Sequence, residues 1–153
     1  MAEYRALDVA MWFVSKFCEH GDLVTHLKVQ KLLYYAEAWT QIICNEPLFI
    51  EDIQAWAHGP VVPEVFHAFK EYGWHPLPAP EVIPSFDANI LDVLEQVYDI
   101  YGEFSAKNLE NMTHLDSPWI DARKGLSEEA RCENGWCFKM YADHFNITIQ
   151  NCG

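Results

Sequence analysis

The 153-residue sequence lacks a hydrophobic run that could cross a membrane, because no segment approaches about 18 uninterrupted apolar residues. Its first residues, MAEYRALDVAM, also lack the cationic stretch and the apolar run of a signal peptide. The five cysteines are odd in number, and Cys18 and Cys44 lie within helical patterns, where a free thiol behaves as a small hydrophobe. We therefore expect a cytoplasmic protein with no membrane partner.

Basic residues are scarce, with 10 Lys and Arg against 23 Asp and Glu, which gives a net charge of −13 at pH 7. A field of this sign repels phosphate backbones, so direct nucleic-acid binding is not expected. A basic protein partner would be attracted to it. The simpler alternative is that the acidity only keeps the protein soluble.

The common signatures of enzymes are absent as well. The chain has no Walker loop and no GxGxxG, GxSxG or HExxH motif. Cys132, Cys137 and His144 are spaced like part of a zinc site, but no convincing second ligand pair accompanies them. We therefore expect neither a metal nor another cofactor.

One pair of residues keeps an enzymatic alternative open. His114 and Asp116 could form a histidine base oriented by a carboxylate, with Arg123 near enough in sequence to hold an anion. No nucleophile or second acid stands beside them. A small hydrolase that uses His114 and Asp116 is therefore the alternative, and a protein without catalytic activity is the expectation.

Half of the residues are apolar and 14% are aromatic, which predicts one packed domain over residues 1–153. The helical spacing of apolar residues is strongest over residues 25–44, and a second face of this helix is also largely apolar. The sequence thus predicts a mainly α, compact helical bundle around this central helix. Thr25 would cap it, Lys28 and Lys31 would form its solvated edge, and His26 would lie in an exposed turn.

Further helices are expected around the central one. The first covers residues 4–20, ends at Gly21 and should pack antiparallel to the central helix. Others begin at Pro63, after Asp87 and after Ser105, and short helices are expected beyond residue 117. Residues 53–57 form at most a short extended segment. The four prolines of residues 74–84 predict an extended crossing over the surface.

Six tryptophans are many for a chain of this length. Tryptophan gives a large contact area at low entropic cost, so it is favoured in interfaces as well as in cores. Trp74 follows Gly73 and begins the proline-rich crossing, which makes it the best candidate for an exposed anchor.

Three stretches of the sequence are familiar: LKVQKLLYYAEAW, EPLFIEDIQAWAHGPVVPEVFHAFKEYG and FSAKNLENMTHLDSPWIDAR. They resemble, in the same order, the SocA-like antitoxin family, which is built on the Panacea domain and includes phage-associated GepA-like proteins. The resemblance covers about residues 7–125. Its most specific part is AWxxGPVVP, and a second signature is formed by Leu109, Thr113, His114, Pro118, Trp119 and Ala122.

The resemblance implies a mostly helical domain that binds and neutralises a protein toxin encoded by a neighbouring gene, in a bacterium or a phage. One relative delivers its toxin to a cytosolic AAA+ protease, so such a protease is a further expected partner. The motif residues and Trp74 are our expected partner-binding set: His58, Gly59, Pro60, Pro63, Trp74, His114, Trp119 and Arg123.

Two other interpretations stay open. Gly59, Pro60, Pro63 and Pro118 could instead set turns and helix starts, since glycine and proline are suited to both. A nucleic-acid-binding regulator is the third class of function, and it would need a local basic face that the sequence does not advertise.

Overall fold

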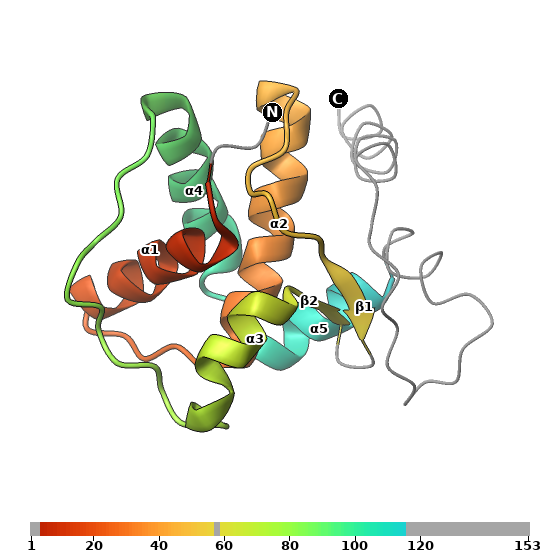
Figure 1. Cartoon of the computed structure of the whole chain (residues 1–153). Coiled ribbons are helices and arrows are strands. Elements are labelled where there is room, and N and C mark those ends of the chain that lie inside the picture. The colour runs from red at the N-terminus through yellow and green to blue at the C-terminus, as the bar shows by residue number, and fades with distance from the viewer. Residues whose placement is uncertain (1–3, 57–58, 116–153) are drawn as a thin grey trace.

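The computed structural model describes residues 4–56 and 59–115 (Figure 1). The elements follow in this order: α1 (Ala6–Glu19), α2 (His26–Cys44), β1 (Gln54–Trp56), β2 (Gly59–Val61), α3 (Pro63–Phe69), the 3₁₀ helix η1 (Lys70–Tyr72), α4 (Ala88–Tyr101) and α5 (Ala106–His114). This part of the chain is mainly helical, which confirms the predicted fold class.

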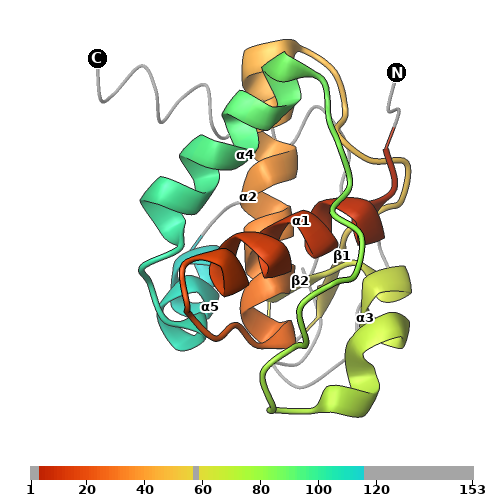
Figure 2. The ribbon, with the colours of Figure 1, turned by 90° about the vertical axis from the view of Figure 1, so that its left-hand side faces the viewer.

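Helix α2 is the centre of the fold. It contacts α1, α3, α4, α5 and β2, and 13 of its 19 residues are buried. Figures 1 and 2 show the other elements arranged around it. A helix that is apolar on more than one face needs neighbours on more than one flank, so the sequence prediction of a central helix is confirmed.

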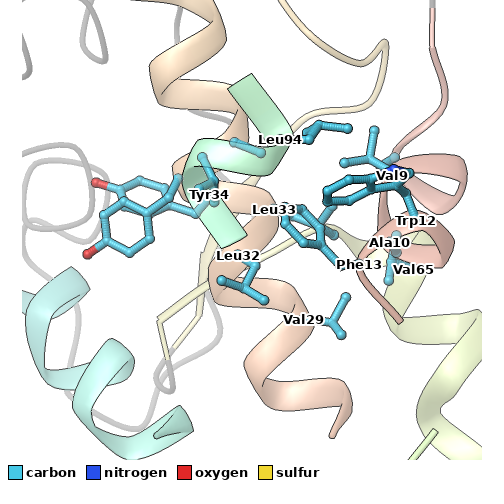
Figure 3. Packing of buried hydrophobic residues seen from close by; sticks show 14 of the residues in the cluster. Val9, Ala10, Trp12, Phe13, Val29, Leu32, Leu33, Tyr34, Val65 and Leu94 are labelled. Carbon is cyan, nitrogen blue, oxygen red and sulfur yellow. The ribbon is translucent and has the colours of Figure 1, made fainter. Parts of the chain in front are cut away.

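The hydrophobic core joins α2 to the helices around it. Leu33 on α2, Phe13 on α1, Leu94 on α4 and Val65 on α3 are all fully buried, and Figure 3 shows their packing. Tyr34 lies on the other flank of α2, away from Phe13, and it is also completely buried. The core therefore extends around α2 instead of covering one stripe of it.

The starts of the helices follow the predicted residues. Pro63 is the first residue of α3, where its missing N–H leaves no gap in the hydrogen bonding. Ser105 caps α5, because its Oγ accepts a hydrogen bond from the N–H of Asn108 at 3.1 Å. Thr25 and Asp87 occupy the cap positions of α2 and α4, but neither side chain makes a capping hydrogen bond.

The short extended segment expected at residues 53–57 is confirmed as β1, but its partner was not predicted. The second strand, β2, forms an antiparallel hairpin with β1 and pairs Val61 with Gln54 and Gly59 with Trp56. Pro60 made this strand hard to predict, because proline has no N–H to donate to a neighbouring strand. Both strands of a two-stranded ribbon are edge strands, where a proline is tolerated. The predicted packing of α1 was wrong, because α1 lies across α2 instead of antiparallel to it, as Figures 1 and 2 both show.

The proline-rich crossing is as predicted, because residues 74–84 contain no helix or strand. It is held to the domain where the N–H of Leu77 donates to the carbonyl oxygen of Val24 at 2.9 Å. The helices expected beyond residue 117 lie outside the described residues. Within residues 4–56 and 59–115, no helix is long and apolar enough to cross a membrane.

Replacing Leu33 with alanine tests the position of the core. Leu33 is 0% exposed, so Leu33→Ala should lower the free energy of unfolding by about 2–5 kcal/mol through lost burial and a residual cavity. Leu23 is 78% exposed, so Leu23→Ala should change it by less than about 0.5 kcal/mol. Urea denaturation of both variants measures the difference. Equal effects would contradict this placement of the core.

Candidate partner-binding site

A side-chain amide on α2 holds the end of the β-hairpin. The N–H of Val62 donates to Oε1 of Gln30 at 2.9 Å, and Nε2 of Gln30 donates back to the carbonyl oxygen of Val62 at 3.4 Å. Val62 directly precedes α3, so Gln30 replaces the backbone partner that a third strand would supply. This clamp fixes both the hairpin and the start of α3 against the central helix.

His26 lies beside this clamp and is buried, not exposed as predicted. Its Nε2 is 2.9 Å from Nε2 of Gln30. Burial, helped by the positive charge of Lys31, lowers the pKa of His26 to about 4. The ring is therefore neutral at pH 7, and its Nε2 can accept the amide hydrogen of Gln30.

Lys31 also contradicts its predicted position on a solvated edge. Its side chain is completely buried, and its ammonium nitrogen has no hydrogen-bond partner among the described residues. Burial lowers the pKa of Lys31 to about 7, while the charge of nearby Glu110 acts in the opposite direction. Lys31 shares a helix face with Tyr34 and Tyr35, three and four positions later, and that face is covered.

Gly59 packs directly against this lysine. A Cβ atom at Gly59 would lie 2.9 Å from Cε of Lys31 and 2.9 Å from Oγ1 of Thr113. Its φ of +104° is also a conformation that residues with side chains rarely adopt. Thr113 in turn donates from Oγ1 to the carbonyl oxygen of Glu110 at 2.8 Å. The hairpin, α2 and α5 therefore meet at a point where only glycine fits.

An apolar groove of about 240 Å³ opens beside the hairpin. Its lining comes from α2, the hairpin, α3, η1 and the turn after η1: His26, Leu27, Gln30, Trp56, Val61, Phe66, Lys70, Gly73 and Trp74. Trp56 and Phe66 meet edge to face with ring centroids 5.0 Å apart. Trp74 is 79% exposed. The groove can accept an apolar side chain from outside, with aromatic rings as its walls.

The predicted site residues fall into three groups. Gly59 and Pro60 are buried and Pro63 is half-buried at the start of α3, so the described motif residues shape the hairpin. Trp74 is exposed and lines the groove. His58, Asp116, Trp119 and Arg123, and the side chain of His114, lie outside what the structure describes; α5 ends at His114.

Sequence analysis missed Gln30, Lys31 and Lys70 as parts of this region. The apolar second face of the central helix was a signal for Lys31, because a lysine between Leu27 and Tyr34 on that face is placed for burial. No local signal pointed to Lys70. Among the described residues, no three His, Cys, Asp or Glu side chains gather in a way that could hold a metal ion.

The class of protein defined by this arrangement is a helical scaffold that carries a clamped β-hairpin and a neighbouring aromatic groove. The family model for the SocA-like antitoxin with a Panacea domain matches residues 29–120, and the chain belongs to this family. The chain is also similar to the antitoxin SocA of Caulobacter vibrioides, with 26% identity over 143 residues, 81% of this chain and 73% of the relative. No solved structure matches the chain.

Gly59→Ala should destabilise the fold by more than backbone strain alone. The added Cβ meets Lys31 and Thr113, so we expect a loss of about 2–4 kcal/mol in the free energy of unfolding. Gly21 is the matched control, because it also has a positive φ, +74°, but open space around a Cβ. Gly21→Ala should cost only about 1–2 kcal/mol. Similar losses in thermal or urea denaturation would mean that the Gly59 contact is unimportant.

The buried Lys31 should make stability depend on pH. Between about pH 7 and 10.5 the unfolded lysine keeps a proton that the folded one has lost, so this residue makes stability rise with pH. The rise is on the order of 5 kcal/mol at 1.36 kcal/mol per pKa unit. Lys31→Met should remove it, as measured by urea denaturation at several pH values.

Lys107 provides the control for this measurement. Its side chain is 75% exposed and lies 3.4 Å from the carboxylate of Glu110, which also acts on Lys31. Lys107→Met should leave the rise between pH 7 and 10.5 in place. A rise that survives in Lys31→Met would show that Lys31 is charged and solvated in the folded protein.

Proposed function

We propose that this chain is a cytoplasmic antitoxin that binds and neutralises a protein toxin encoded by a neighbouring gene. Membership of the SocA-like family supports an antitoxin role. The net charge of −13 favours a basic protein partner over nucleic acid. The role proposed here is one of binding, without catalysis.

The observation that carries the proposal is the exposed Trp74 at an apolar groove. A tryptophan that is 79% exposed is unusual in an isolated protein, and tryptophan is among the residues that contribute most to binding energy. Trp56 and Phe66 line the same groove and would enclose a side chain of the toxin.

Within the proposal, the described motif residues have two roles. Trp74 contacts the toxin directly, whereas Gly59, Pro60 and Pro63 position the hairpin that forms one side of the groove. His58, His114, Trp119 and Arg123 remain proposed contacts. Neutralisation would occur by occlusion, because an aromatic anchor on an acidic protein can cover a working surface of a basic toxin.

Delivery of the toxin to a AAA+ protease is the second route by which such a complex could neutralise it. The two routes differ in the lifetime of the toxin inside the cell. Occlusion leaves the level of toxin unchanged when the antitoxin is co-expressed, whereas delivery shortens its half-life. A pulse–chase measurement of the toxin with and without this chain separates them.

The proposed function is tested by expressing the neighbouring gene alone and together with this chain. We expect growth arrest with the first and recovery with the second, and a complex in a pull-down from the same cells. A harmless neighbour, or recovery without a complex, would contradict direct neutralisation. The dissociation constant of the purified wild-type complex then serves as the reference for the variants.

Trp74→Ala should weaken toxin binding by about 2 kcal/mol, or roughly 30-fold in the dissociation constant, because it removes the exposed anchor. Ile50→Ala is the control, since Ile50 is 64% exposed and lies in the loop after the far end of α2. It should bind almost as well as the wild type. Isothermal titration measures both, and an unaltered affinity in Trp74→Ala would remove Trp74 from the interface.

A further inference from the structure

The groove has a charged residue on the same side as its exposed tryptophan. Helix η1 ends at Tyr72. Gly73, the next residue, has a φ of +56°, and its N–H donates to the carbonyl oxygen of Lys70 at 3.2 Å. This tight turn brings Lys70 and Trp74, four residues apart, to the lining of one groove. A charged residue and an exposed tryptophan thus line the same groove.

Lys70 is unusual among the cations that the structure describes. Four of the six are engaged or enclosed: Lys16 pairs with Glu95 at 2.9 Å, Lys28 donates to the carbonyl oxygen of Gly102, Lys31 is buried, and Lys107 lies 3.4 Å from Glu110. Arg5 and Lys70 are exposed, and neither side chain makes a hydrogen bond or ion pair with the described residues. Of these two, Lys70 alone lines the groove.

The size of the groove decides what kind of occupant it fits. The groove has a volume of about 240 Å³. Sites for small molecules and cofactors usually measure about 300–1,000 Å³. The groove therefore suits one or two side chains of another protein better than a free ligand. Its aromatic walls, Trp56 and Phe66, select an apolar side chain.

We propose that the groove takes an apolar side chain of the partner protein and that Lys70 pairs with an Asp or Glu carboxylate next to it on the partner. This inference rests on the proposed function, because the toxin is the partner. The net charge of −13 attracts a basic toxin as a whole, whereas Lys70 binds one carboxylate on the toxin surface. An ammonium group that has no partner among the described residues, beside an apolar groove, complements a carboxylate beside an apolar anchor.

The test compares two charge reversals on the full-length chain. Lys70→Glu and Arg5→Glu change the net charge equally and both alter an exposed side chain, so their difference removes the general effect of charge. We expect Lys70→Glu to weaken toxin binding about tenfold or more and Arg5→Glu to stay within about twofold. The difference should shrink as salt is raised from 0.05 to about 0.5 M, because ions screen an exposed pair.

A selection on the toxin identifies its side of the contact. Toxin variants chosen for renewed binding to Lys70→Glu should replace an Asp or Glu beside an apolar residue with Lys or Arg. Wild-type affinity in Lys70→Glu, or selected changes confined to other residue types, would overturn the inference and leave the antitoxin function in place. If the wild-type chain itself fails to bind the toxin, the proposed function is wrong and the inference falls with it.

A second copy of this chain is the competing occupant. Analytical ultracentrifugation of the chain without toxin distinguishes this case. A monomer for both the wild type and Lys70→Glu agrees with a groove that is open to the toxin. A homodimer that dissociates in Lys70→Glu would show that the groove binds another copy, and it would overturn the assignment to the toxin.

Discussion

The burial of polar side chains along α2 is the constraint on which the rest of the structure depends. A helix with neighbours on several flanks has no face on which to place its polar residues in water. Gln30 meets this constraint by binding both backbone groups of Val62. Glu37 meets it by accepting the N–H of Leu48 in the loop after α2. Both side chains satisfy backbone groups of residues that lie outside the helices and strands.

This solution has a cost that is visible in the titratable groups. Burial raises the pKa of Glu37 to about 7, although hydrogen bonds from Leu48, Gln41 and Phe49 oppose the shift. Lys31 is buried without a hydrogen-bond partner among the described residues, and the buried Oγ1 of Thr40 also lacks one there. A buried polar group that lacks a partner costs about 1–3 kcal/mol. The apolar core around Leu33 and Phe13 must offset that cost.

Sequence analysis succeeded where local rules decide the structure. The spacing of apolar residues located the helices. Pro63 and Ser105 marked the starts of α3 and α5, and the prolines of residues 74–84 indicated the stretch without helix or strand. It failed where distant segments decide. Lysine has a strong preference for water, and Lys31 is buried because the hairpin and α5 cover its face of α2. The position of Trp74 in the sequence indicated that it is exposed, but the groove beside it is formed by residues from five elements: α2, β1, β2, α3 and η1.

The residues that line the groove fall into two groups: buried or packed side chains held by contacts within the domain, and exposed side chains at its rim. Gln30, His26 and Phe66 are held by hydrogen bonds or ring contacts within the domain, so a change at these positions alters the fold before it alters binding. Lys70 and Trp74 are exposed and follow α3 on a short turn, so their side chains can be exchanged with little effect on the core. A scaffold built in this way can keep its architecture while its rim is adapted to another toxin. Specificity would then depend on a few exposed side chains, and stability on the buried polar residues beneath them.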